Sequence, residues 1–121
     1  MAALRDLAEF YDPDLYLPIN GRTYRIKCPG ISEADRLTVV VVDPSLTAEQ
    51  EADEIRKILG PARDEMAANG VPSAMAIHAG RTALLHFGAS PALARTHWQL
   101  GQLGDVADLQ AILDAAAPAD G

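Results

Sequence analysis

The sequence predicts a mainly α-helical domain with an N-terminal β-hairpin packed on the helices, which is an α+β fold. Asn20-Gly21 separates two short segments of alternating apolar and polar residues, the pattern of a tight hairpin. Residues 73–88 carry small and apolar residues that share one side of a helical wheel: Ile77, Gly80, Leu84 and Phe87. The chain has 121 residues, 49% of them hydrophobic, and no long linker, so we expect one core.

The domain is therefore expected to span residues 1–116, with the hairpin at 15–27 and a flexible C-terminal tail at 117–121. The net charge of −7 argues against nucleic-acid and anionic membrane partners. No apolar run approaches the length of a membrane-spanning helix. A single cysteine, Cys28, excludes an internal disulfide and a site with several thiolate ligands, so a reducing cytoplasm is the simplest location.

The N-terminal elements follow from spacing and turn chemistry. Leu4, Leu7 and Phe10 are spaced as in a helix, which predicts a short helix over residues 3–10. In the hairpin, a two-residue type I′ turn at Asn20-Gly21 fixes the pairing. The expected pairs are Ile19 with Arg22, Leu17 with Tyr24, and Leu15 with Ile26. The apolar face formed by the last two pairs should rest on the helices, because an isolated hairpin is marginal in water.

Residues 32–42 give conflicting signals. Ser32 followed by Asp35 is typical of a helix start, with Ser32 as the N-cap. The four valines at 39–42 are β-branched and would suit a buried strand. We favour a helix.

Four further helices are expected. Thr47 and Gln50 form a capping-box pattern before a helix that ends at Leu59. A short helix should begin at Pro61 and end at 69–70. Residues 73–88 and 90–100 form the next two, the second capped by Ser90. A last helix is expected over residues 106–116.

The residues give little support for catalysis. His78 and His86 are eight apart, whereas a metal site on one helix favours a spacing of four. Thr82 and Ser90 have no nucleophile motif around them, and Cys28 has no basic cluster that would lower its pKa. The acids Glu49, Glu51, Asp53 and Glu54 are interpreted as a solvated helix face. We expect no enzyme activity, cofactor or metal.

Two blocks of the sequence resemble the tail assembly chaperones of long-tailed, siphovirus-type phages of actinobacteria. The first is LRDLAEFYDPDLYLPINGRTYRI, which has that family's D-L-x-E-F helix, D-P turn, L-x-L-P-I strand and G-R-T-Y-R strand in order. The second is ILGPARDEMAANGVPSAMAIHAGRTALLHFGASPALARTHW, with G-x-x-x-D-E-M and H-A-G-x-T-A motifs. The match covers residues 4–27 and 58–98, whereas the valine run and residues 106–116 lie outside it.

The resemblance implies a non-catalytic role in phage tail assembly. Such chaperones coat the tape measure protein and help the major tail tube protein polymerise around it. They also occur in a longer, frameshifted form, and self-association is a further possibility. They act in the host cytoplasm and are absent from the mature virion.

A client-binding surface is expected in the window between Met66 and Gly104, which contains no Asp or Glu although the chain has 17 of them. The candidate partner-binding residues are Met75, Leu85, Phe87 and Trp98. For Phe87 and Trp98, a place in the core is at least as well supported by the sequence. Two other functions stay open: a structural tail or head-tail connector component retained in the virion, and a small cytoplasmic enzyme or regulator.

Overall fold

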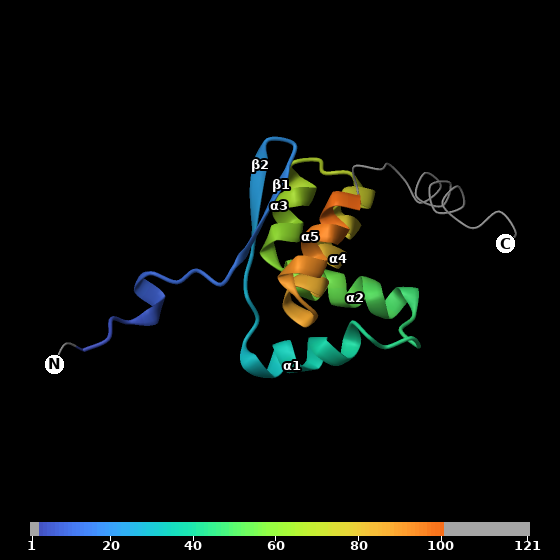
Figure 1. Ribbon diagram of the computed structural model, residues 1–121. Coiled ribbons are helices and arrows are strands. Elements are labelled where there is room, and N and C mark those ends of the chain that lie inside the picture. Colours follow the sequence, from blue (N-terminus) through green and yellow to red (C-terminus); the bar gives the residue numbers. More distant parts are fainter. Residues whose placement is uncertain (1–2, 101–121) are drawn as a thin grey trace, which may run out of the picture.

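The computed structural model describes residues 3–100, which form a two-stranded hairpin and five α-helices (Figure 1). The hairpin consists of β1 (Leu15–Ile19) and β2 (Arg22–Ile26), and α3 (Pro61–Ala68) lies against β2. The centre of the helical part is α4 (Ser73–Gly88), which contacts α1 (Ile31–Val40), α2 (Ala48–Leu59), α5 (Pro91–Leu100) and β1. The predicted α+β class is confirmed.

The hairpin has the predicted register. Its antiparallel pairs include Leu15 with Ile26, Leu17 with Tyr24, and Ile19 with Arg22. Asn20 and Gly21 have φ values of 57° and 81°, as a type I′ turn requires. The inward face is buried and consists of Leu17, Ile19, Tyr24 and Ile26, with Leu15 half-buried beside it. This face packs on the helices because a two-stranded sheet has no other way to bury its apolar side.

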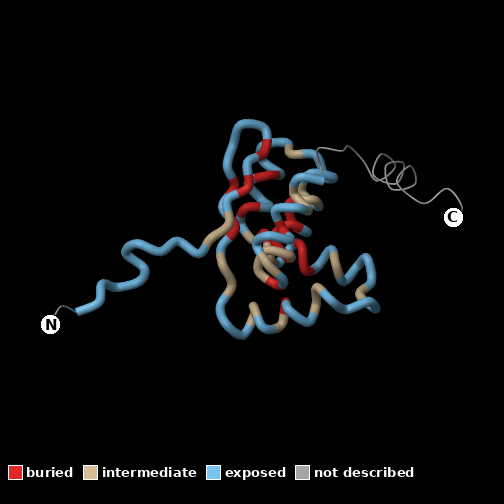
Figure 2. Tube along the Cα trace, in the orientation of Figure 1, coloured by how far each residue is buried: buried red, intermediate tan, exposed pale blue. Residues whose placement is uncertain are grey.

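The predicted helix over residues 3–10 is wrong. Only a three-residue 3₁₀ helix, Leu7–Glu9, forms there. Residues 3–13, which we call the arm, are all exposed and project from the body (Figures 1 and 2). A helix this short is marginal in water unless it packs against something, and within residues 3–100 the arm has no apolar face to pack on.

The helix at residues 32–42 was preferred over a strand, and α1 confirms that choice. The prediction of Ser32 as the N-cap is wrong. The helix starts at Ile31 and its N-cap residue is Gly30, so Ser32 lies inside the first turn. The helical conformation buries Leu37 against the body, where α1 packs on α4. One consequence is that Val39 is left 66% exposed.

The start and stop signals predicted for α2, α3 and α5 are confirmed. Thr47 and Gln50 form a reciprocal capping box, with bonds of 2.9 and 3.1 Å. Pro61 is the first residue of α3, and Gly70, with a φ of 73°, follows its end. Ser90 Oγ accepts a hydrogen bond from the Leu93 amide at 3.1 Å before α5. The helix predicted at residues 106–116 and the tail at 117–121 lie outside the described residues.

The inward face of α4 differs in part from the predicted stripe. Gly80 and Leu84 are buried as expected, but Ile77 is 39% exposed. Thr82, which is not part of the predicted stripe, is buried and donates a hydrogen bond to the His78 carbonyl at 2.9 Å. A single stripe was a poor description because α4 has neighbours on several sides (α1, α2 and α5).

Glycine lets α1 and α2 approach α4 closely. A Cβ placed on Gly80 would lie 2.3 Å from Ile55 Cγ2, in α2. One on Gly88 would lie 2.9 Å from the Leu37 carbonyl oxygen, in α1. Both distances are far shorter than a van der Waals contact, so these two positions exclude any side chain.

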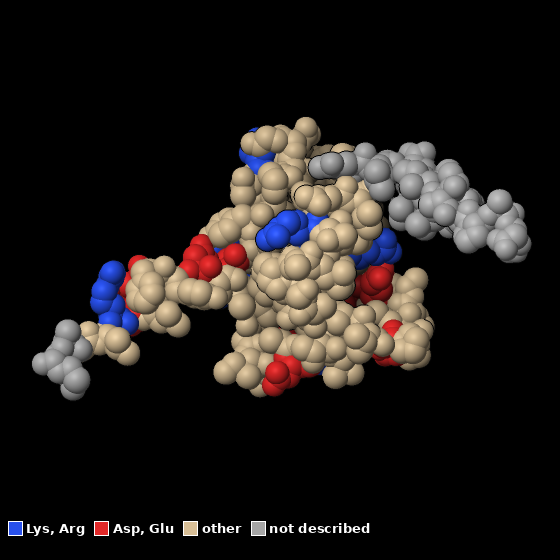
Figure 3. Space-filling model, in the orientation of Figure 1, with Lys and Arg blue, Asp and Glu red and all other residues tan. Residues whose placement is uncertain are grey.

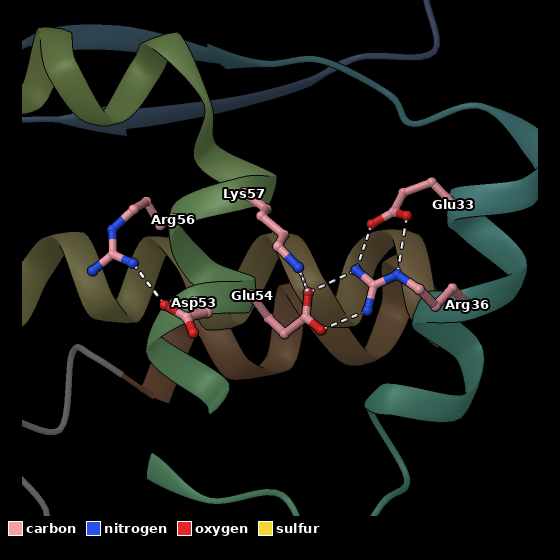
Figure 4. A network of polar contacts seen from close by, with 6 residues as sticks. All are labelled: Glu33, Arg36, Asp53, Glu54, Arg56 and Lys57. Atoms are coloured by element: carbon pink, nitrogen blue, oxygen red, sulfur yellow. Dashed lines mark hydrogen bonds and ion pairs between the residues drawn. The ribbon is translucent and has the colours of Figure 1, made fainter. Parts of the chain in front are cut away.

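A polar network also joins α1 to α2 (Figure 4). Arg36 Nη1 and Nη2 donate to the two Glu54 carboxylate oxygens at 2.6 and 2.7 Å, and Arg36 also binds Glu33. Glu54 is only 8% exposed, so its predicted place on a solvated face is wrong. The hydrogen bonds and charge of Arg36 hold the pKa of the Glu54 carboxyl below its usual value, against the opposing effect of burial. By contrast, the Asp53–Arg56 pair is exposed.

We predict that Gly80→Ala destabilises the fold by roughly 1–3 kcal/mol through overpacking against Ile55. Helix propensity alone would stabilise by about 1 kcal/mol, so the sign is diagnostic. Urea unfolding of a double-mutant cycle with Ile55→Ala provides the test. In the Ile55→Ala background the alanine at position 80 has room, so it should cost nothing or increase stability. If Gly80→Ala lowered the free energy of unfolding equally in both backgrounds, contact between residues 55 and 80 would not be what limits the approach of α2 to α4.

A second prediction concerns Glu54. Glu54→Gln should lower stability by roughly 1–3 kcal/mol at pH 7, because the Arg36 guanidinium loses a charged partner. A lowered native pKa stabilises above the unfolded glutamate pKa of about 4.3, and this contribution disappears as the pH falls further. The gap between wild type and variant should therefore narrow below pH 4 in urea titrations. Asp53→Asn, at the exposed pair, is the control and should change stability little.

Candidate protein-binding site

Two adjoining hollows run along the outer side of α4, and together we call them the α4 groove. One, of about 320 Å³, lies between the end of α1, α2, α4 and α5. The other, of about 330 Å³, lies between α2 and α4 and reaches Arg63 in α3. The apolar residues in their walls are Val40, Val41, Leu46, Ala48, Ala52, Ile55, Leu59, Ala76, Ile77, Leu84 and Leu85. The groove is thus an open, largely apolar channel beside one helix.

The two hollows meet at an ion pair between α2 and α4. Arg81 Nε and Nη2 donate to Glu51 Oε1 at 3.1 and 2.8 Å, and both residues line both hollows. Each side chain keeps substantial contact with solvent, so the pair contributes at most about 1 kcal/mol to stability. Its main effect is to place a charge pair in the middle of an apolar channel. Glu51 was also predicted to lie on a solvated face, and the structure shows that it is paired instead.

Histidines form one end of the α4 groove. His97 lines it, and its ring stacks on that of His78, with centroids 4.4 Å apart. His78 Nε2 lies 3.1 Å from the Trp98 carbonyl oxygen, whereas His97 Nε2 is buried and has no hydrogen-bond partner among residues 3–100. Burial, followed by the nearby His78 and Arg81, lowers the pKa of His97. His97 is therefore harder to protonate than a histidine exposed to solvent.

A further hollow, of about 630 Å³, is a weaker candidate for binding. It lies between the β2–α1 connection, α1, α2 and α3, and Cys28 is in its wall. Its charges are mixed, and two of its acids, Glu33 and Glu54, are already bound to Arg36. The α4 groove offers more apolar surface to a protein partner.

The described residues contain no cluster of three or more histidine, cysteine or acidic side chains that could hold a metal ion. The hydroxyls considered as nucleophiles have local partners: Thr82 binds the His78 carbonyl and Ser90 caps α5. Cys28 is half-buried, and its Sγ lies 3.5 Å from the Pro29 carbonyl oxygen. Within residues 3–100, no helix combines the length and apolar character needed to cross a bilayer.

Residues 5–120 match a protein family described as a domain of unknown function, DUF7426. This chain belongs to the DUF7426 family. No curated protein and no solved structure is significantly similar to it. The function of this DUF7426 domain must therefore be argued from its own residues.

The structure does not bring the four candidate partner-binding residues together. Leu85 lies in the α4 groove. Met75 is 51% exposed in the first turn of α4, outside the groove walls. Phe87 packs against the core and meets His86 edge to face at 4.7 Å. Trp98 also packs on the core and lines a separate hollow beside β1.

Sequence reasoning missed most of the α4 groove. Ile77 was assigned to the core, and the contributions of Val40 and Val41 were not anticipated. The valine run itself carried a signal: four consecutive apolar residues on a helix cannot all face one way, so some must line a surface. Nothing in the sequence pairs Glu51 with Arg81, which are thirty residues apart.

We predict that acid weakens the DUF7426 fold through His97 and His86, whose pKa values burial lowers. Histidines of the unfolded chain take up protons near pH 6.5, whereas these two histidines of the folded chain take them up only at lower pH. The free energy of unfolding should therefore decrease as the pH is lowered from 7.5 to 5.5. His97→Phe removes one titrating ring and its unpartnered nitrogen. It should be at least as stable as wild type at pH 7.5 and lose less on acidification, as measured by urea unfolding at both pH values. An equal loss in wild type and variant would contradict this prediction.

Proposed function

We propose that this DUF7426 domain is a tail assembly chaperone of a long-tailed phage. In this role it binds the tape measure protein in the host cytoplasm and promotes assembly of the tail tube around it, without catalysing a reaction. The sequence resemblance over residues 4–27 and 58–98 supports the biological setting. Physical support comes from the surface that the fold leaves open.

The observation that carries the proposal is the α4 groove. A long helical client presents apolar residues at helical spacing, and a groove between helices accepts such a stripe. Leu85 of α4 shares one hollow with Val40 and Val41 at the end of α1, and Ile77 of α4 lines the other. The Glu51–Arg81 pair between the hollows offers a client both a donor and an acceptor. An apolar channel with one ion pair at its middle is a surface to which an amphipathic helix can bind.

The charge distribution fits the same role. The chain carries 17 acids, but none lies between Met66 and Gly104, the stretch that supplies α4 and α5. A net negative charge keeps the protein soluble, while an acid-free stretch avoids repelling a client. The proposed partners are the tape measure protein, the major tail tube protein and a longer frameshifted form of this chain.

Co-expression with the tape measure protein encoded beside this gene tests the proposal. Wild type should raise the soluble fraction of the client several-fold. Ile77→Gln should lose most of that gain, because it places an amide in the groove wall. Val39→Gln is the matched control, since Val39 is also an exposed helical residue but lies outside the groove walls. It should behave as wild type, and circular dichroism should show that both variants are folded.

Two results would contradict the proposal. One is a client that is no more soluble with the chaperone than without it. The other is the presence of this chain in purified virions by mass spectrometry, at a level comparable to tail proteins. The second result would support the alternative of a structural tail or connector component.

A further inference from the structure

The arm, residues 3–13, is an apolar segment without a partner in its own domain. Leu4 is 98% exposed and Phe10 62%, and Leu7 and Tyr11 are similarly open to solvent. Their spacing places Leu4, Leu7, Phe10 and Tyr11 close together on one side of a helix. Such a segment has too little apolar contact to fold alone in water. Binding to a surface that covers the stripe buries its apolar area, which favours a folded, bound arm.

The base of the arm is joined to the hairpin by hydrogen bonds. Asp14 accepts one from the Cys28 amide at 2.8 Å and another from Arg25 Nε at 2.5 Å. The arm precedes β1 and points away from the helices (Figure 1). Its apolar side chains are therefore open to another molecule.

A hollow that suits this stripe lies next to the base of the arm. It has a volume of about 200 Å³ and is lined by residues of β1, α4 and α5. Its walls are apolar at Leu15, Leu17, Pro18, Ala94 and Trp98. Pockets for small ligands usually exceed about 300 Å³, so this hollow is suited to one or two inserted side chains. We call it the β1–α5 hollow.

The charges of the arm and of the β1–α5 hollow are complementary. The arm carries three acids, Asp6, Glu9 and Asp12, against one base, Arg5, which gives a net charge of −2. Arg5 pairs with Glu9, and the Tyr16 hydroxyl donates a hydrogen bond to Asp12. The hollow contains Arg95 and His86 but no acid. Arg95 forms no ion pair within residues 3–100, and α5 presents basic but no acidic atoms on the face seen in Figure 3.

We propose that the arm binds in the β1–α5 hollow of a second copy of this chain, so that two copies exchange arms. The arm and the hollow share one edge of the molecule, because Leu15 and Tyr16 follow the arm and also line the hollow. A two-fold axis near that edge brings each arm to the other copy's hollow, which closes the assembly as a symmetric dimer. Eleven residues span about 36 Å when extended and about 16 Å as a helix, enough for either bound form.

Sedimentation of the full chain over a range of concentrations tests the exchange. Wild type should form a dimer, and Phe10→Ser should weaken it about tenfold or more through loss of the aromatic anchor. Arg95→Glu should weaken it too, through repulsion of the arm acids. Val39→Ser is the matched control, because Val39 has a similar exposure to Phe10 but lies on α1, and it should not change the dimer. Trp98, the only tryptophan, reports occupancy: its emission should shift with concentration in wild type but not in Phe10→Ser.

A photo-crosslinking amino acid at position 10 separates exchange from folding back. In a mixture of isotopically light and heavy chains, exchange yields crosslinks from position 10 of one isotope to α5 or β1 of the other. Crosslinks only within one isotope, or a monomer at all concentrations, would overturn the proposal. The experiment contains no client and the arm lies outside the α4 groove, so its outcome is independent of the chaperone function.

Discussion

The arrangement of the helices depends on the close approach of α2 to α4 at Gly80. Ile55 occupies the space that any side chain at position 80 would need, with its Cγ2 only 2.3 Å from where a Cβ would lie. Gly88 likewise allows α1 to approach α4, because a side chain there would collide with the Leu37 carbonyl. These two glycines sit eight residues apart on one helix, so α4 receives one neighbour at each. The Arg36–Glu54 bridge then ties the two neighbours to each other, which closes a triangle of helices around a small core.

This close packing leaves apolar surface uncovered. Helices that meet at glycines and alanines bury little side-chain area, so larger residues such as Ile77 and Leu85 remain at the margins of the contact. The α4 groove runs beside these contacts, since Ile55, which meets Gly80, and Val41, which meets Gly88, both line it. An apolar channel of this kind follows from using small residues at the centre of a helix cluster. In that sense the binding surface and the stability of the fold have the same structural cause.

The local signals in the sequence were sufficient for individual elements. Asn20-Gly21 requires positive φ at two successive positions, and Thr47 with Gln50 satisfies two backbone amides, so both features act within a few residues. The residues of the candidate site cannot be predicted from local signals. Whether Ile77 faces the core or the solvent depends on which helices surround α4, and Glu54 is buried only because Arg36 reaches it from α1. The helix expected over residues 3–10 failed for the same reason, because spacing describes a face but not whether a partner covers it.

The two open apolar features of the molecule differ in what they require from a partner. The α4 groove is concave and belongs to the rigid body, so it can accept a helix without reorganising. The arm is a convex stripe with no surface behind it, so it must order on binding and loses conformational entropy when it does. A self-complementary contact suits the arm, because a dimer orders two arms while burying two stripes. Under the two proposals the client binds in the groove and the second copy binds the arm, so both contacts can exist at once. A dimer of this kind would present two grooves to one extended client.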